Sequence, residues 1–75
     1  MGQSISCHRE FKIHDLRFEI KRVRDWDVQK TFYVLFNIEY VIDQYGISHI
    51  FPVGNGVVCD KNITDEEAYK LWLKA

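Results

Sequence analysis

Residues 31–42, TFYVLFNIEYVI, constrain the fold more than any other stretch of this chain. Every even position is apolar or aromatic, whereas the odd positions mix polar and apolar side chains. Successive residues of a strand point to opposite faces, so a strand here has one wholly apolar face and one half-apolar face. The stretch is rich in β-branched and aromatic residues and has neither Gly nor Pro. We therefore predict that it forms the central strand of a sheet.

The length and composition are typical of one small globular domain. A chain of 75 residues buries only about 60–65% of its unfolded surface, so its core is thin. Five Phe, four Tyr and two Trp compensate for this, because each aromatic side chain can bury on the order of 150–250 Å². With 47% hydrophobic and 28% charged residues, the composition excludes a disordered chain.

The charge is nearly balanced overall but unevenly distributed. The formal net charge is −1, which by itself indicates no polyanionic or polycationic partner. Residues 1–30 hold seven basic and five acidic side chains, and residues 31–60 hold three acids and no Lys or Arg. The pattern is a mild charge asymmetry, neither a basic arm nor an acidic tail.

The small polar residues 1–9 are predicted to form a flexible leader, followed by a single domain over residues 10–75. The leader also fits an acylation pattern, in which Gly2 takes a myristoyl group and Cys7 a second, palmitoyl chain. No signal peptide and no apolar run of about 18 residues is present. We expect a cytoplasmic protein that meets a membrane only if Gly2 is acylated.

Residues 10–26 alternate between polar and apolar positions, but the alternation slips around His14-Asp15 and again around Lys21-Arg22. The slips indicate either one long strand with a bulge or two short strands. A helix is the rival interpretation, and the polar positions beside Phe18 favour a strand. Residues 25–30 are polar and are predicted to form a connecting turn.

The segment after the central strand is predicted to form an edge strand. Asp43 to Gly46 suits a turn, and residues 47–53 alternate again. Pro52 cannot donate a ladder hydrogen bond, so this strand belongs at the edge of the sheet. Residues 54–56, Gly-Asn-Gly, indicate a tight turn, after which residues 57–59 add a short fourth strand.

The last element is an amphipathic helix with a clear start. Thr64 and Glu67 have the spacing of a capping box, and residues 65–67 place negative charge at the helix N-terminus. We expect this helix to lay Leu71 and Trp72 across the apolar face of the sheet. The predicted fold is α+β, a small antiparallel meander of three to four strands with one C-terminal helix packed on one face.

The residues suited to metal binding or catalysis lack the spacing that such sites need. The soft ligands Cys7, His8, His14, His49 and Cys59 show no paired spacing, so we predict neither a metal nor a cofactor. The thiol of Cys59 stands beside a carboxylate, which raises a thiol pKa rather than lowering it. No nucleophile elbow or phosphate loop occurs. The protein is predicted not to be an enzyme.

A run of basic residues over 17–24 offers one possible binding function, nucleic-acid recognition. Phosphate contacts would come from the cations and base stacking from an aromatic ring nearby. The candidate cations are Arg17, Lys21, Arg22 and Arg24. Acidic residues interleave with these cations and cancel much of their field. A nucleic-acid-binding module is therefore the alternative function.

Protein binding is the preferred function, because one helix can cover only one face of the sheet. The odd positions Tyr33, Leu35 and Val41 are then expected to be exposed, with Trp26 nearby. A contiguous exposed apolar patch usually marks an interface, and Tyr and Trp are enriched at interface centres. We predict a non-catalytic interaction protein, either an accessory or inhibitory subunit that docks on a larger protein or a homodimer.

Overall fold

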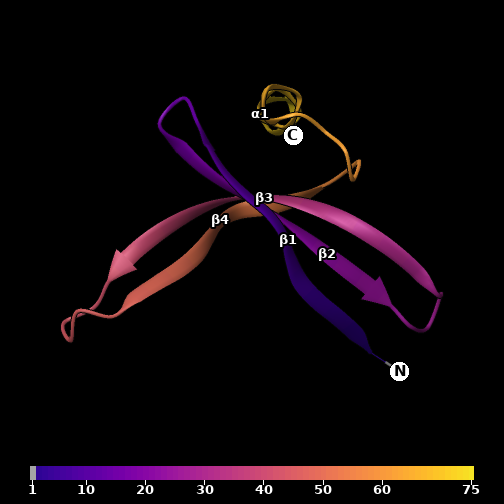
Figure 1. The fold of residues 1–75 in the computed structure, drawn as a ribbon, viewed down its shortest axis with the longest axis horizontal. Coiled ribbons are helices and arrows are strands. Elements are labelled where there is room, and N and C mark those ends of the chain that lie inside the picture. Colours follow the sequence, from indigo (N-terminus) through magenta and orange to yellow (C-terminus); the bar gives the residue numbers. More distant parts are fainter. Residues whose placement is uncertain (1) are drawn as a thin grey trace.

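A computed structural model describes residues 2–75 of the chain, as four strands and one helix. The elements are β1 (Gln3–Ile13), β2 (Leu16–Asp25), β3 (Lys30–Ile42), β4 (Ser48–Cys59) and α1 (Asp65–Lys74). The strands form one antiparallel sheet in the order β1-β2-β3-β4, with α1 above it (Figure 1). The predicted α+β meander with a C-terminal helix is confirmed, and the central position of β3 is confirmed with it.

A two-residue turn at His14-Asp15 joins β1 to β2. Both residues have positive φ, at 51° and 63°, and Ile13 pairs with Leu16 across the turn. Positive φ at both central residues matches the right-handed twist of a hairpin. The slip in the sequence pattern therefore marks the end of one strand and the start of the next, and not a bulge. A bulge does occur in β1, where the register shifts between Cys7 and Arg9.

The first strand starts earlier than the sequence indicates. Residues 3–9, expected to form a flexible leader, lie in β1 and pair with residues 20–25 of β2. The backbone of Trp26 also donates a hydrogen bond of 3.2 Å to the carbonyl of Gly2. Main-chain pairing with β2 orders this segment despite its small polar side chains, so the expected boundary at residue 10 falls inside a strand. Residue 1 of the expected leader lies outside the described residues.

The edge strand β4 is continuous through the predicted tight turn. Residues 54–56 lie inside β4, where the register with β3 shifts between Leu35 and Asn37. The prediction of a turn there is wrong, because the two glycines form a bulge opposite Phe36. A Cβ added at Gly56 would lie 2.6 Å from the Phe36 ring, so this close approach requires glycine. The edge position of the Pro52 segment is confirmed.

The core lies between α1 and the middle of the sheet. Phe18, Ile20, Leu35 and Ala68 are fully buried there. The Phe18 ring meets Trp72 edge to face, with 5.3 Å between the ring centroids. The predicted capping box is present: the backbone N–H of Glu67 donates to Thr64 Oγ1 at 3.1 Å, and the backbone N–H of Thr64 donates to Glu67 Oε1 at 3.1 Å.

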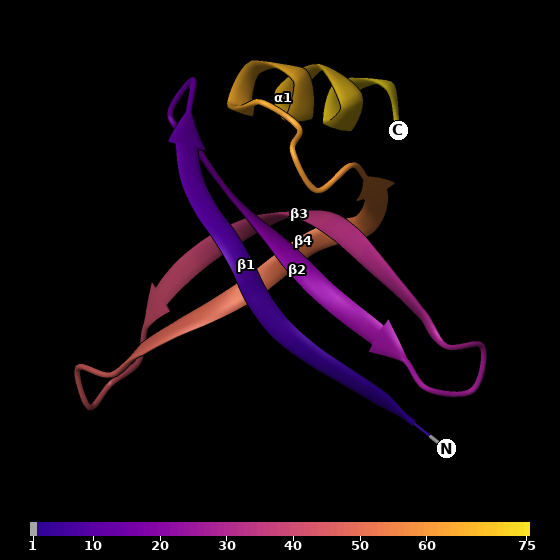
Figure 2. The ribbon, with the colours of Figure 1, turned by 45° about the vertical axis from the view of Figure 1, so that its right-hand side comes forward.

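The sheet curves away from α1 at both ends, so the molecule has the shape of an arch with the helix on its outer side (Figures 1 and 2). We name the two ends by their strands. The β3–β4 arm comprises residues 39–53, which include the turn between these strands, and the β1–β2 arm comprises residues 2–7 and 21–33. Both arms extend beyond the part of the sheet that the helix covers.

Candidate protein-binding surface

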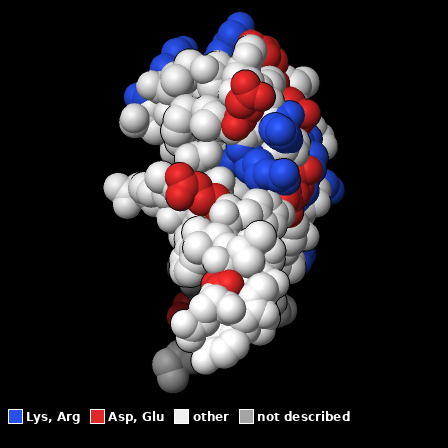
Figure 3. All heavy atoms as spheres, turned by 90° about the vertical axis from the view of Figure 1, so that its left-hand side faces the viewer, with Lys and Arg blue, Asp and Glu red and all other residues white. Residues whose placement is uncertain are grey.

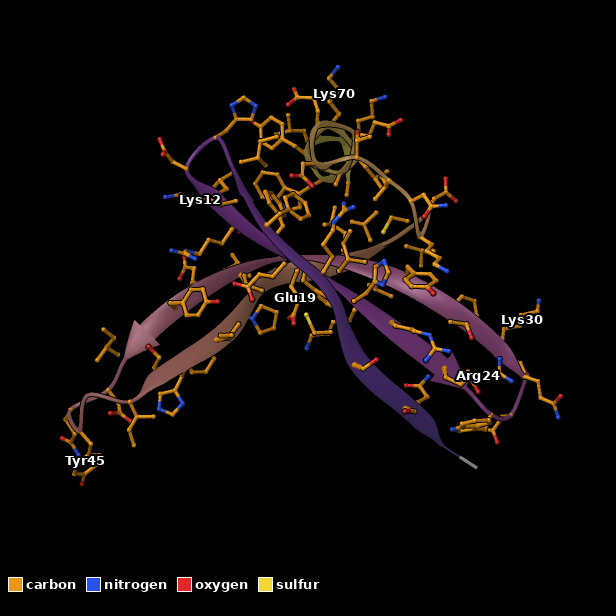
Figure 4. All side chains as sticks on the ribbon, in the orientation of Figure 1. Lys12, Glu19, Arg24, Lys30, Tyr45 and Lys70 are labelled. Carbon is orange, nitrogen blue, oxygen red and sulfur yellow. The ribbon has the colours of Figure 1, made fainter. Side chains whose placement is uncertain are left out.

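The strand register decides which side chains lie beneath α1 and which lie on the opposite side of the sheet. Ile20 of β2 pairs with Leu35 of β3, and both belong to the core, so the odd positions of β3 face the helix. Its even positions face away. We call this second side the open face; Glu19 of β2 lies on it in Figure 4, below the sheet and away from the helix.

The face expected to be exposed is instead the one that the helix covers. Leu35 has no exposed surface, and Tyr33 is half-buried against the core, so the expectation that these two residues lie on an exposed face is wrong. Their role in partner binding stays a prediction. The neighbouring strands supply the physical reason. Phe11, Phe18 and Ile20 lie on the same side as Leu35, so three neighbouring strands form one contiguous apolar cluster on this side.

The other two predicted partner-binding residues are exposed but lie far apart. Val41 is 45% exposed and belongs to the β3–β4 arm. Trp26 is 54% exposed and lies in the turn between β2 and β3, at the opposite end of the sheet. The guanidinium carbon of Arg24 lies 5.0 Å from the centre of the Trp26 ring. The four residues therefore do not form one surface.

The largest exposed apolar surface is the β3–β4 arm itself. Its large apolar side chains are at least 39% exposed and point to both faces of the hairpin: Tyr40, Val41, Ile42, Tyr45, Ile47, Ile50, Phe51 and Val53. The arm contains no Lys or Arg, and its only acidic residues are Glu39 and Asp43. In Figure 3, which faces this end of the molecule, the lower part of the surface is almost entirely white.

Asp43 holds the tip of this arm in a defined conformation. Its carboxylate accepts hydrogen bonds from the backbone N–H groups of Tyr45 (2.8 Å) and Ile47 (3.0 Å) and contacts the ring nitrogen of His49 at 2.8 Å. These interactions, the one with His49 foremost, lower the pKa of the Asp43 carboxyl. Gly46 completes the turn with a φ of 79°. The tip is thus ordered while it exposes Tyr45 and Ile47, at 78% and 56%.

In the middle of the open face, charged groups lie over the buried Ile38 and the half-buried Phe36, and several of them have partners within the chain. The guanidinium of Arg17 lies over the Tyr40 ring, 4.8 Å from its centre. The Tyr40 hydroxyl donates a hydrogen bond to the Glu10 carboxylate, which raises the pKa of Tyr40. Lys21 Nζ lies 3.8 Å from Glu19 Oε1. These contacts connect the three strands β1, β2 and β3 across the open face.

The predicted nucleic-acid-binding cations do not form one basic surface. Arg17 and Lys21 lie on the open face, whereas Arg22 and Arg24 alternate with them and face the other side. Arg24 donates a hydrogen bond of 3.2 Å to Thr31 Oγ1. The nucleic-acid alternative stays a prediction, and the alternation of these cations does not favour it.

Both thiols have a raised pKa. Burial raises the pKa of the half-buried Cys59 thiol. Burial and a hydrogen bond to Glu19 raise the pKa of the Cys7 thiol on the open face. A raised pKa keeps a thiol protonated, and the thiolate is the reactive form. Acylation of Gly2 and Cys7 stays a prediction.

Within residues 2–75, the structure contains no cluster of three or more His, Cys, Asp or Glu side chains that could hold a metal ion. No helix of this described part has the length and apolar composition needed to cross a membrane. Comparison of the chain with protein-family models, with curated proteins and with solved structures found no match.

The sequence contains a sign of the exposed β3–β4 arm that the pattern of β3 alone does not give. The absence of Lys and Arg over residues 31–60, together with the alternation over 47–53, marks the two strands of the arm. The sequence does not reveal that most of residues 39–53 lie beyond α1. It therefore does not mark Ile42, Tyr45 and Ile47 at the tip as exposed.

Proposed function

We propose that this protein is a non-catalytic interaction protein, a small accessory or inhibitory subunit that docks on another protein chain through its β3–β4 arm. One observation carries the proposal: eight large apolar side chains are exposed together on an arm without a single Lys or Arg. Large exposed apolar patches mark interaction sites in soluble proteins.

The area of this surface supports the proposal. The exposed fractions, applied to about 150–250 Å² for each large side chain, give roughly 800 Å² of exposed apolar side chain. The largest patch on a typical monomer is about 300–600 Å², and one partner contributes about 800 Å² to a standard interface. Because these side chains lie on both faces of the hairpin, a partner buries the whole area only by contacting both faces.

The arm also has the order that a docking surface needs. Because the interactions of Asp43 hold the turn, binding does not have to freeze a flexible tip, and pre-organisation lowers the entropy that binding costs. The two tyrosines, Tyr40 and Tyr45, combine apolar area with a hydroxyl group and few rotatable bonds. Such side chains are enriched at the centres of interfaces.

The faces of the arm are better suited to binding than its edge. β4 is an edge strand, and an unpaired edge can accept another strand. Pro52 removes one backbone donor from β4, and the bulge at residues 54–56 interrupts its regular pairing. We therefore expect a partner to cover the side chains of the arm and not to extend the sheet.

A pull-down from a lysate of the source cell tests the proposal, with a C-terminal tag so that Gly2 stays free. The double variant Ile50→Glu/Phe51→Glu charges both faces of the arm, and Leu73→Glu is the matched control because Leu73 is 57% exposed on α1, outside both arms. We expect the native chain and the control to retain the same stoichiometric partner, whether another protein or an untagged copy, and the double variant to lose it.

Two results would contradict docking through the arm. One is equal partner recovery by the native chain and a folded double variant. The other is recovery of nucleic acid with loss of every protein partner after nuclease treatment, a result that would support the basic run over residues 17–24 instead. Circular dichroism of the double variant establishes that it is folded.

A further inference from the structure

We infer that a second copy of this chain covers the open face. In this dimer the two sheets pack open face to open face, and the β3–β4 arm of each copy lies against the β1–β2 arm of the other. The inference rests on the proposed function, and it names the partner and adds a second binding region, the underside of the β1–β2 arm.

The first support is that apolar side chains are exposed on the open face at both ends of the arch. Tyr40, Ile42 and Ile50 lie on this side of the β3–β4 arm, with exposures of 40%, 69% and 46%. At the other end the exposed large residues of this face are Ile5 (58%), Phe32 (36%) and Val58 (66%). The charged groups in the middle of the face lie between these two apolar regions.

The second support is the distribution of charge on the open face. On the β1–β2 arm, Lys21, Asp25 and Lys30 face this side, whereas the strand residues of the β3–β4 arm place no charged side chain on it. Contact between two β1–β2 arms would bring like net charge together, which disfavours association. Contact between unlike arms avoids this repulsion.

Twofold symmetry makes the contact between unlike arms twice. In an isologous dimer, if region A of one copy contacts region B of its partner, then region B contacts region A of the partner as well. Both apolar ends of the open face are then covered in one closed assembly. With about 150–250 Å² for each large side chain, the exposures of the six apolar residues at these two ends give roughly 600 Å² per copy and roughly 1,200 Å² for two copies, the lower end of a standard interface, about 1,200–2,000 Å².

Face-to-face packing, with about 10 Å between the sheets, is a common arrangement of antiparallel sheets. Because the open face is the inner side of the arch, the two copies meet at their arms and not at the middle of the sheets. Here each sheet already has α1 on its outer side, so the dimer has four layers, with helices outside and sheets inside. The central polar groups need no new partner, because Arg17 packs on Tyr40 and Glu10 accepts the Tyr40 hydroxyl within each copy.

Sedimentation velocity of the purified full chain over a dilution series tests the inference. We expect a species of about twice the 9.0 kDa mass of one chain that dissociates on dilution. The variants Ile50→Lys and Ile5→Glu, one on each arm, should each be monomeric. Leu73→Glu is the matched control, because Leu73 is 57% exposed on the helix, and it should dimerise like the native chain.

Mixing the two monomeric variants tests which arms meet. In the proposed arrangement, a mixed dimer places the lysine introduced by Ile50→Lys on one chain against the glutamate introduced by Ile5→Glu on the other. The second contact of that mixed dimer pairs the native Ile50 with the native Ile5. An equimolar mixture of Ile50→Lys and Ile5→Glu should therefore recover the dimer. A mixture that stays monomeric contradicts contact between unlike arms.

A native chain that stays monomeric at millimolar concentration overturns the inferred dimer, and so does a dimer that Leu73→Glu abolishes while Ile50→Lys does not. A monomeric result leaves docking on another protein standing, because the pull-down reads that function separately. If the native chain dimerises but the double variant recovers the same partner as the native chain in the pull-down, the dimer stands and docking through the β3–β4 arm does not.

Discussion

The two faces of the sheet carry alternate residues of the same strands, yet α1 covers only one face. On β3 the even positions are the more apolar set, but α1 packs on the odd positions, above Leu35. The neighbouring strands decide the outcome, since β2 places Phe18 and Ile20 beside Leu35 and places Glu19 and Lys21 on the opposite side. The face that a helix covers is set by the whole sheet and not by its most apolar strand.

The largest test of this difference compares two phenylalanines. Phe18 is fully buried on the covered face, and Phe51 is 51% exposed on the β3–β4 arm. Phe18→Ala should lower the free energy of unfolding by about 3–5 kcal/mol, because it leaves a cavity in a small core. Phe51→Ala should change it by less than about 1 kcal/mol. Urea denaturation of both variants at one protein concentration measures the effects, and equal losses would contradict the assignment of the core.

A smaller loss is expected at the bulge of β4, where the open face is tightly packed. The Cβ of Gly56→Ala would lie 2.6 Å from the ring of Phe36 and from the side chain of Val34. Relief of this overlap should cost about 1–3 kcal/mol of unfolding free energy. Denaturant unfolding provides the measurement, and an unchanged midpoint would mean that residues 54–56 do not approach β3 as described.

The helix cap should have an effect of about 1 kcal/mol. Thr64→Ala removes the hydrogen bond that Glu67 donates from its backbone to Thr64 Oγ1, and loss of a Thr cap typically costs about 0.5–2 kcal/mol. The cap belongs to α1, and the tip of the β3–β4 arm lies away from this helix. Hydrogen exchange should therefore increase for amides of α1 and not for those at the tip. Thr64→Ser keeps the hydroxyl group and is the matched control; an equal loss with Ser would exclude the cap.

The smallest expected effect is the pH response of the β3–β4 tip. The pKa of Asp43 is lowered by its interactions with His49 and with the backbone of Ile47. A lowered carboxyl pKa stabilises the folded turn above the unfolded value, about 3.9, and this contribution is lost as the pH falls through the lower folded value. The amide NMR signals of Tyr45 and Ile47 should shift in that acidic range. Signals that stay constant in this range would contradict the hydrogen bonds that the Asp43 carboxylate accepts from the turn.

The sequence predicted the elements that depend on local chemistry. The capping box at Thr64 and the edge position of Pro52 follow from groups within a few residues of each other, and the structure contains both. The central strand was predictable because its alternation is long and uninterrupted.

The features that depend on distant strands were not predictable from local patterns. The order of residues 3–9 comes from backbone pairing with β2, which no side chain in that segment signals. The Gly-Asn-Gly sequence fits a turn and a bulge equally well, and the facing Phe36 decides between them. The alternation of β3 alone predicts an exposed Leu35, and the residues of β2 beside it show that it belongs to the core.

The most direct test of a covered open face is a dilution series followed by NMR of the isoleucine methyl groups. Ile5, Ile42 and Ile50 lie on the open face, and Ile13 and Ile63 lie beside the helix. We predict concentration-dependent shifts for the first three methyl signals and constant positions for the other two. Shifts confined to Ile13 and Ile63 would place the interface on the helix side, and five constant signals up to millimolar concentration would mean that no second copy covers the open face.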